Sequence, residues 1–386
     1  SQQEENDLRY AWLPFLLITD LNVPSVRLGN SGLKVSRLIL GLMSYGNKQW
    51  DEWVLDEEEG IKHIKAAHFS YDAGIQTFDT ANVYSNGDSE RILGKAIKQL
   101  NLPRDEIVVM TKVCMLFHIT HPTLTFTSKL YNVVAREPGE LILVNGGDGS
   151  EGDAKGYTNQ YGLSRKHIFE SIKHSLERLQ LDYVDVLQCH RFDYYTPIAE
   201  TMQALHDVVK AGYARYIGMS SCHAYQFHAM QNYAITNKLT PFISMQNQHS
   251  LVYREEEREM MPTLKMFGVG MIPWSPLSQG ILSRPYEAIS LRGETSKFSG
   301  MWAKTKEDNK EVILRVESIA KARGVTMAQV AIAWSLSKDV ISAPIVGTTK
   351  LENLYDLLGA IDVKLTEEEI KQLEEPYVAQ AIQGFV

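Results

Sequence analysis

Short apolar segments alternate with amphipathic segments along most of this chain. Apolar runs of strand length occur eight times, and turn residues or helix-patterned stretches separate each run from the next. We predict a β-strand at RLILGL (37–42), IQTFDT (75–80), IVVMTK (107–112), VDVLQCH (184–190), ARYIGMS (214–220), FISMQN (242–247), VGMIPWS (269–275) and ISAPIVG (341–347).

The segments between these runs carry the periodicity and the end signals of α-helices. Residues 164–180 begin at Ser164, a favourable N-terminal cap, and place their apolar residues along one helical face. Residues 89–100 likewise begin with Ser89 as the expected cap. Further helices are predicted at 57–74, 197–212, 225–236, 255–267, 306–323, 326–338 and 350–360.

The alternation of eight strands with helices indicates the fold class. It favours a parallel sheet closed into a barrel, so we predict an α/β protein with the (β/α)8 TIM-barrel architecture. The rival fold is an open dinucleotide-binding sheet, which would place G-x-G-x-x-G directly after a strand. None of the eight predicted strands is followed by that motif.

Two parts of the chain precede the first strand. Residues 23–36 contain two short extended runs around GNSG, which predicts a β-hairpin that plugs the floor of the barrel. We interpret 1–25 as an N-terminal extension and 26–386 as a single barrel domain. The apolar stretch 10–19 is too short to span a bilayer and follows an acidic segment, so neither a membrane segment nor a signal peptide is expected.

A long inserted loop is predicted at 115–162, between the third strand and the next helix. It has Gly-rich punctuation and no clear helical period, and a hairpin within 140–149 is only weakly indicated. A structureless stretch of this length is typical of a lid, a binding loop or a disordered segment. Two hypotheses stay open: the loop shapes access to a pocket, or it points away from it.

The composition and net charge of the chain indicate which kinds of partner to expect. The net charge of −8 and the pI of about 5.8 give no broad basic excess for nucleic acid, although a local pocket can still hold a small anion. The cysteines are Cys114, Cys189 and Cys222, without a CxxC pair, which predicts reduced thiols in a cytoplasmic protein. An oligomer is possible, and the sequence does not specify one.

The predicted strands end in polar or aromatic side chains. In a (β/α)8 barrel the C-terminal strand ends meet on one face, where active sites are built. Each residue alone has a structural explanation, such as a capping aspartate or a buried histidine, but together they favour a site. These strand ends are Asp79, Lys112, His190, Ser220, Gln246 and Trp274–Ser275.

Four residues of this set suit proton transfer to a carbonyl oxygen. A free phenol titrates near ~10, and a neighbouring ammonium stabilises its charged form. Lys112 would act in this way on Tyr84, and Asp79 would supply the counter-charge that a buried lysine needs. His190 would hydrogen-bond the substrate oxygen or relay the proton. No HExxH motif is present and no metal is required.

A series of motifs resembles the aldo-keto reductase superfamily, in the style of its aryl-alcohol dehydrogenase-like and versiconal hemiacetal acetate reductase-like branch. In family order they are FDTANVYSNGDSERILGKAI (78–97), VVMTK (108–112), DYVDVLQCHR (182–191), YIGMSS (216–221), SMQNQHSLVYREEEREM (244–260), GMIPWSPLSQGIL (270–282) and APIVGTTKLENLYD (343–356). The resemblance implies NADPH-dependent reduction of an aldehyde or ketone. In it Tyr84 is the general acid, Lys112 and Asp79 are its tuning pair, and His190 orients the carbonyl.

The resemblance also implies a set of cofactor contacts. Trp274 matches the aromatic residue that stacks on the nicotinamide, and Ser220, Ser221 and Gln246 match the residues around its carboxamide. An arginine that holds the 2′-phosphate in some branches is replaced by Asn353, so Lys350 and Arg284 become the candidates for that charge. The remaining cofactor candidates are Met43, Asp79, Ser275, Pro276, Leu277, Ser278, Gly280, Gly347, Thr349 and Asp356, and the substrate candidates are Tyr45 and Trp50.

Two alternative functions were weighed. The chain also resembles voltage-gated potassium-channel β subunits, which share the barrel and bind NADPH as regulatory partners, but these generally carry Asn where this chain has His190. A glycosidase on the same fold would need two carboxylates facing each other at strand ends, and only Asp79 is found. The sequence therefore favours the reductase.

Overall fold

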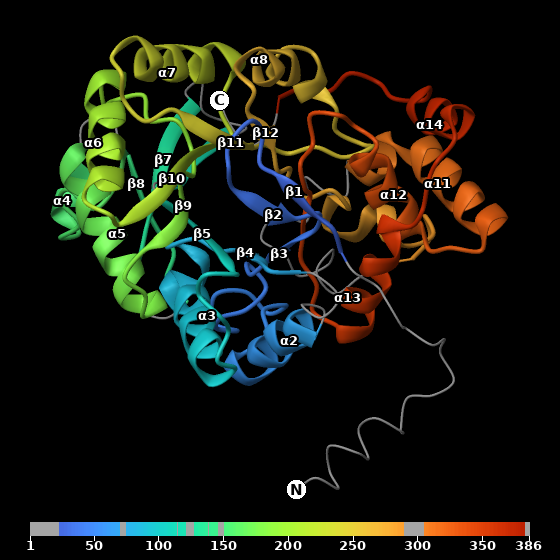
Figure 1. Cartoon of the computed structure of the whole chain (residues 1–386), viewed down its shortest axis with the longest axis horizontal. Helices are drawn as coiled ribbons and strands as arrows, with labels where there is room; N and C mark the ends of the chain where they lie inside the picture. The colour runs from blue at the N-terminus through green and yellow to red at the C-terminus, as the bar shows by residue number, and fades with distance from the viewer. Residues whose placement is uncertain are drawn as a thin grey trace, which may run out of the picture.

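Eight parallel strands form a barrel surrounded by helices in the computed structural model (Figure 1). The structure describes residues 23–69, 75–113, 115–120, 127–137, 139–145, 150–288 and 305–382. The predicted extension 1–25 lies outside the described residues as far as residue 22. The predicted (β/α)8 barrel is confirmed, and all eight predicted strands are present within it.

The barrel strands are shorter than the apolar runs that predict them. They are β3 (Ile39–Gly41), β4 (Thr77–Asp79), β5 (Val108–Val113), β9 (Val184–Cys189), β10 (Ala214–Ser220), β11 (Phe242–Gln246), β12 (Gly270–Met271) and β13 (Ile345–Val346). The α-helices are α2 (Glu57–Phe69), α3 (Asp88–Gln99), α4 (Ser150–Ala154), α5 (Arg165–Leu179), α6 (Ile198–Lys210), α7 (Ala224–Thr236), α8 (Met260–Phe267), α11 (Lys310–Arg323), α12 (Met327–Leu336), α13 (Leu351–Leu358) and α14 (Glu367–Glu374).

The sheet closes on itself. Its strand order is β12-β11-β10-β9-β5-β4-β3-β13, and every neighbouring pair is parallel. The two ends of the sheet meet where β12 and the residues after it contact β13 and the segment before it. Met271 N donates to Val340 O at 3.0 Å, and Ile345 N of β13 donates to Pro273 O at 2.9 Å. Because closure removes both sheet edges, all carboxyl ends of the strands gather at one mouth.

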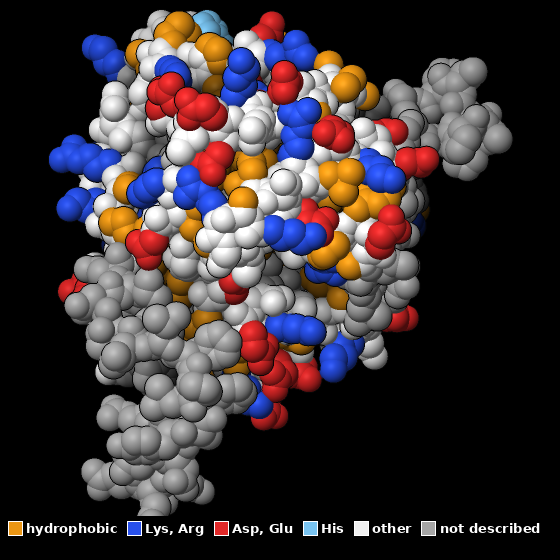
Figure 2. All heavy atoms as spheres, turned by 90° about the vertical axis from the view of Figure 1, so that its right-hand side faces the viewer, with side chains coloured by type: hydrophobic (Ala, Val, Ile, Leu, Met, Phe, Trp, Pro, Cys, Tyr) orange, Lys and Arg blue, Asp and Glu red, His pale blue; other side chains and the backbone are white. Residues whose placement is uncertain are grey.

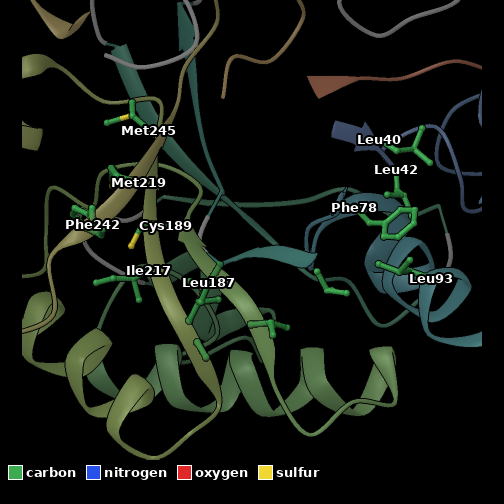
Figure 3. Close-up of a cluster of buried hydrophobic side chains, with 14 of the residues drawn as sticks. Leu40, Leu42, Phe78, Leu93, Leu187, Cys189, Ile217, Met219, Phe242 and Met245 are labelled. Atoms are coloured by element: carbon green, nitrogen blue, oxygen red, sulfur yellow. The ribbon is translucent and has the colours of Figure 1, made fainter. Parts of the chain in front are cut away.

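Two apolar layers hold the barrel, because successive strand residues point to opposite sides of a sheet. Ile39 belongs to the cluster inside the barrel, whereas Leu40 packs outward under the helices. Figure 3 shows Leu40 and Phe78 beside Leu93 of α3. It shows a second outward group from β9, β10 and β11, which contains Leu187, Cys189, Ile217, Met219, Phe242 and Met245.

The predicted N-terminal hairpin is confirmed. Strands β1 (Ser25–Arg27) and β2 (Lys34–Ser36) pair antiparallel. Leu28 between them joins the apolar cluster inside the barrel, so the hairpin packs against its amino-terminal end. Gly29 has a φ of +58°, and a Cβ there would lie 2.5 Å from Gly268 O, so only glycine fits this close approach.

Two predicted helix starts are wrong. The helix predicted at 255–267 is a 3₁₀ turn, η2 (Glu255–Glu257), followed by α8 from Met260. Pro262 is tolerated only in the first turn of a helix, which forces this later start. Ser89 is not a cap either: α3 begins at Asp88, and Ser89 Oγ instead donates to Leu42 O at 2.9 Å, joining α3 to the barrel.

The predicted structureless loop at 115–162 is also wrong. Strands β6 (Met115–Thr120), β7 (Thr127–Val133) and β8 (Ile142–Asn145) form an antiparallel sheet, followed by α4 (Figure 1). Residues 146–149 of the hairpin suggested within 140–149 lie outside the described residues, and β8 pairs with β7. Tyr131, Val133 and Val144 are buried in the main core, so period-2 alternation gives this insert one apolar face.

The outer face near α11 and α14 carries charges of both signs, interspersed over the surface (Figure 2). Arg323 on α11 pairs with Glu369 on α14, with Nε 2.6 Å from Oε1. Helix α14 was not predicted, although the T-x-x-E capping box formed by Thr366 and Glu369 marks its start. Among the described helices, none has the length and apolarity needed to cross a bilayer.

Candidate active site

An ion pair and a phenol meet at the barrel mouth. Lys112 Nζ lies 2.5 Å from Asp79 Oδ2 and 3.3 Å from Tyr84 Oη, and it also donates to Thr80 O at 2.9 Å. Lys112 has no exposed surface, and Asp79 and Tyr84 are 2% and 9% exposed. The structure therefore brings two of the predicted catalytic residues, Asp79 and Tyr84, within hydrogen-bonding reach of a third, Lys112.

Tyr84 occupies the first position of a short 3₁₀ segment, η1 (Tyr84–Gly87), just after β4. The chain folds back here because Ser85 and Asn86 take left-handed conformations, with φ of +48° and +53°. Asparagine tolerates that region better than most residues. This reversal turns the chain from β4 into α3 and leaves Tyr84 beside the ammonium of Lys112.

Burial and charge act in opposite directions on Lys112. Burial alone would lower its pKa, whereas the carboxylate of Asp79 and the hydroxyl of Tyr84 raise it, and the net pKa lies above the ordinary value of lysine. Lys112 is therefore an ammonium at neutral pH. Its charge faces the phenol across 4.9 Å from Nζ to the ring centroid.

His190 lies beside Tyr84, directly after β9. The two rings are 5.8 Å apart and meet edge to face. Burial, with smaller effects of the Arg191 and Lys112 charges, lowers the pKa of His190 well below its ordinary value, so the imidazole is neutral. Its Nδ1 is buried without a hydrogen-bond partner among the described residues. The fourth predicted residue thus has a free hydrogen-bonding position next to the phenol.

Two glutamine amides hold the other oxygen of Asp79. Gln188 Nε2 and Gln246 Nε2 each donate to Asp79 Oδ1 at 2.9 Å, and Gln246 Nε2 donates to Gln188 Oε1 at 3.0 Å. Gln246 was predicted as a cofactor contact, but Gln188 was missed. It lies two residues before His190 and therefore on the same face of β9, but the sequence does not show which side chain it contacts.

The residues predicted around a nicotinamide lie at adjacent strand ends. Ser220 Oγ donates to Gln246 O at 2.6 Å, and Trp274 Nε1 donates to Ser221 Oγ at 3.0 Å. The Trp274 indole is therefore fixed at the rim while remaining partly exposed. Because Gln246 uses Nε2 within the network, its Oε1 remains as the acceptor for a ligand amide.

The loop after Trp274 is a series of tight turns. Ser275, Ser278, Gln279 and Gly280 all have positive φ, between +48° and +94°. Two of its amides donate inside the loop, Ser278 N to Ser275 O and Gly280 N to Leu277 O, each at 2.9 Å. The half-buried Arg284 guanidinium lies next to Gly280. The loop also contains Pro276 and Leu277, which the sequence predicted as cofactor contacts.

The residues predicted at the adenosine end differ in their surroundings. Gly347, Lys350 and Asn353 are exposed and Thr349 is partly exposed, so their surfaces are open to a ligand. Asp356 is engaged elsewhere: its Oδ2 accepts from Thr326 Oγ1 at 2.8 Å, which ties α13 to the start of α12. That bond accounts for Asp356 without a ligand.

The two predicted substrate residues behave differently. Tyr45 was predicted to line the pocket, but it has no exposed surface and packs against His63 with ring centroids 5.3 Å apart. It belongs to the core beneath α2, which corrects the prediction. Trp50 is partly exposed and meets the ring of Trp53 edge to face. Met43 packs on the apolar cluster that contains Tyr84.

The insert is bound to the loops that carry Tyr84 and His190. Asn86 Nδ2 donates to Glu140 O at 2.9 Å, and Asn86 Oδ1 accepts from Ala135 N at 3.1 Å. Near His190, Asp193 accepts hydrogen bonds from Tyr131 Oη and, at 2.6 Å, from Leu163 N. The insert, α5 and the loop before Tyr84 line a half-open cavity of about 390 Å³.

Glu256 is a buried acid that contacts Asn247, the residue after Gln246. It is 4% exposed, and its Oε2 accepts from Asn247 Nδ2 at 2.5 Å. Burial raises the pKa of Glu256 to about 8, with Glu255 adding to the effect and the Asn247 hydrogen bond opposing it. Glu256 is therefore protonated in the folded protein at neutral pH.

Glu256→Gln is expected to stabilise the protein increasingly as the pH rises from about 5 to 8. Between the ordinary pKa of an exposed glutamate and the raised folded value, the wild-type folded state binds a proton that the unfolded state lacks. Wild-type stability therefore falls over this window, whereas the glutamine variant does not titrate. Thermal unfolding of both proteins at pH 5, 6.5 and 8 measures the difference; a constant difference would contradict the shift.

No group of three or more His, Cys, Asp and Glu side chains is arranged to hold a metal ion within the part of the chain that the structure describes. The described cysteines, Cys189 and Cys222, are buried free thiols. The site chemistry thus consists of a phenol, an ammonium, a carboxylate, an imidazole and two amides.

Comparison with known proteins shows the family of the chain. The model of the Aldo/keto reductase family matches residues 37–377. Versiconal hemiacetal acetate reductase of Aspergillus parasiticus is 47% identical over 359 residues, covering 92% of this chain and 97% of the relative. A Schizosaccharomyces pombe protein that bears an aryl-alcohol dehydrogenase name is 47% identical over 365 residues, covering 92% and 96%. Aldo-keto reductase AFTS1 of Alternaria alternata is 45% identical over 360 residues, covering 93% of both chains. The chain therefore belongs to the aldo/keto reductase family.

Proposed function

We propose that this oxidoreductase reduces an aldehyde or ketone to the alcohol with NADPH, and that Tyr84 is the proton donor. The observation that supports this most is the position of Lys112 Nζ, 2.5 Å from Asp79 Oδ2 and 3.3 Å from Tyr84 Oη. Carbonyl reduction needs a hydride at carbon and a proton at oxygen. A bound nicotinamide nucleotide would supply the hydride, and the chain supplies the proton.

The side chains divide the proton transfer between them. As negative charge develops on the carbonyl oxygen, Tyr84 gives up its hydroxyl proton, and the Lys112 ammonium stabilises the phenolate that remains. Asp79 keeps Lys112 charged in a buried position. The neutral His190 donates a hydrogen bond to the same oxygen through its ring N–H and so orients the carbonyl beside Tyr84. The alcohol leaves, and solvent returns the proton to the phenolate.

The rim residues would hold the cofactor across the mouth. Trp274 offers an aromatic face to the nicotinamide, and Gln246 Oε1 offers an acceptor to its amide. The left-handed loop 275–280 would receive the pyrophosphate, and Lys350 and Arg284 would neutralise a 2′-phosphate. That last pair supports NADPH over NADH. Burial of both described cysteines as free thiols also supports the cytoplasm as the location.

Absorbance at 340 nm during turnover of 4-nitrobenzaldehyde tests the proposal, with NADPH and NADH in parallel and a panel of aldehydes and ketones. We expect oxidation of NADPH, with a higher kcat/KM than for NADH. A protein that binds NADPH tightly and turns over no carbonyl would instead be a nucleotide-binding regulatory module. His190, which has a free hydrogen-bonding position, supports the enzyme over that alternative.

We also propose that the insert of β6–β8 shapes substrate access. Asn86→Gly keeps the left-handed backbone but removes the hydrogen bonds to the insert. We expect the KM of bulky aromatic aldehydes to change by about threefold or more, the equivalent of roughly one hydrogen bond, while that of small aliphatic aldehydes stays constant. Asn101→Gly is the matched control, because Asn101 has a similar φ of +50° on an exposed turn. Equal effects on all aldehydes would contradict the proposal.

A further inference from the structure

The Asp79 carboxylate contacts two amide donors in addition to the Lys112 ammonium. The carboxylate lies at 2% exposure, so water cannot solvate it, and each oxygen has its own donors. Oδ2 faces the Lys112 ammonium, and Oδ1 receives the amides of Gln188 and Gln246, each at 2.9 Å. A buried carboxylate that accepts several hydrogen bonds is stabilised in its charged form.

We propose that Gln188 is a positioning residue, which keeps the Asp79 carboxylate aimed at Lys112 during carbonyl reduction. The inference rests on the proposed function. Gln188 touches neither Tyr84 nor Lys112 by a hydrogen bond among the described residues, and it has no exposed surface with which to contact substrate. It reaches the ion pair through its hydrogen bond to Asp79, and it also accepts a hydrogen bond from Gln246.

An amide suits this position for a chemical reason. Gln188 and Gln246 donate through N–H groups that do not titrate, so neither can exchange a proton with Asp79. A serine or a histidine at the same place would offer a hydroxyl or a titrating nitrogen. The bond from Gln246 Nε2 to Gln188 Oε1, at 3.0 Å, also fixes which end of the Gln188 amide faces the carboxylate.

The neighbouring strand leaves room for this side chain. Gly218 on β10 lies opposite Gln188 in the parallel register. A Cβ at Gly218 would lie 3.2 Å from Gln188 Cγ and still closer to Ser244 Oγ, so a larger residue would displace the glutamine. The interior of the barrel is thus packed around the amide at the level of the catalytic ion pair.

Two variants that keep the shape of the side chain test the role of the amide. Gln188→Met removes the donor, and we expect kcat to fall by about 10–100-fold, which corresponds to the loss of one hydrogen bond to a charged group. The KM for the aldehyde should change much less than kcat, because Gln188 has no exposed surface with which to bind substrate. NADPH affinity, measured by fluorescence titration, should stay unchanged.

Gln188→Glu places a second carboxyl beside Asp79, and two adjacent carboxyls tend to share one proton. We expect a larger loss of kcat than in Gln188→Met, and this variant provides the test if the methionine variant does not fold. Ser244→Ala is the matched control: Ser244 is equally buried in the barrel, and its hydroxyl has no partner in the described structure. It should keep the wild-type kcat and KM.

The outcomes separate this inference from the proposed function. If both Gln188 variants bind NADPH and keep the wild-type kcat while Tyr84→Phe is inactive, the positioning role is wrong and the function stands. If Tyr84→Phe keeps full activity, the assignment of the proton donor is wrong, and if the wild-type protein turns over no carbonyl, the proposed reduction is wrong. A merely structural role for Gln188 would lower the melting temperature of the variants without a selective loss of kcat.

Discussion

Tyr84→Phe is expected to lower kcat for carbonyl reduction by about 10²–10⁴-fold, the contribution typical of a positioned general acid. The substitution removes one oxygen and leaves the ring in the apolar cluster formed with Ala81 and Val83. The proton donor 3.3 Å from Lys112 Nζ is then absent, while the cofactor surface is intact. Steady-state kinetics with 4-nitrobenzaldehyde give the loss in kcat, and fluorescence titration gives the NADPH affinity.

The control for Tyr84→Phe uses a phenol outside the site. Tyr225 is 67% exposed near the start of α7, so Tyr225→Phe makes the same chemical change on the surface. We expect its kcat to match that of the wild type. If the Tyr84→Phe variant turns over substrate at the wild-type rate, the assignment of Tyr84 as proton donor is wrong. No other described hydroxyl lies within hydrogen-bonding reach of Lys112 Nζ and could replace it.

Lys112→Met is expected to abolish turnover and to lower the free energy of unfolding by about 3–5 kcal/mol, the usual cost of leaving one member of a buried ion pair without its partner. The Asp79 carboxylate would remain buried with only the two amide donors. Urea unfolding measures the loss. Lys95→Met is the control, because the Lys95–Glu57 pair has a similar separation of 2.7 Å but is exposed, and such pairs contribute about 1 kcal/mol or less.

A double variant separates the two effects of Lys112. Asp79→Leu combined with Lys112→Met removes both charges, and replacement of a buried pair by apolar residues is often neutral for stability. We expect the double variant to recover most of the stability lost in Lys112→Met while remaining inactive. A double variant as unstable as the single one would mean that the packing of Lys112, rather than its charge pairing, is what stabilises the barrel.

The sequence predicted the polar residues that meet at the barrel mouth better than the residues that hold them in place. Asp79, Lys112 and His190 are polar residues at the ends of apolar runs, and the closed parallel sheet brings such ends together whatever the loops do. Gln188 was missed because a polar residue inside a strand has no meaning until the barrel shows which side chain it faces. The prediction of Tyr45 as a substrate residue is wrong for a related reason. The loop after β3 turns this side chain under α2, and the local sequence does not encode that direction.

The insert shows the same limit. Its strands β6–β8 are short, and an isolated small sheet is marginal, so their stability comes from a face that packs on the core. The residues that fasten the insert are Asn86 and Asp193, which lie in other segments of the chain. Nothing within 115–162 indicates that Asn86 and Asp193 bind this segment. The sequence alone therefore predicted a structureless loop.

By itself the sequence determined the (β/α)8 barrel, the N-terminal hairpin and the residues gathered at the mouth, because hydrophobic period, caps and strand ends are local properties of the chain. Only the tertiary structure decided the distances within the Lys112 network, the two amides on Asp79 and the neutral state of His190. Those depend on burial and on pairs far apart in sequence, such as Asp79 and Gln246, which no local pattern can bring together.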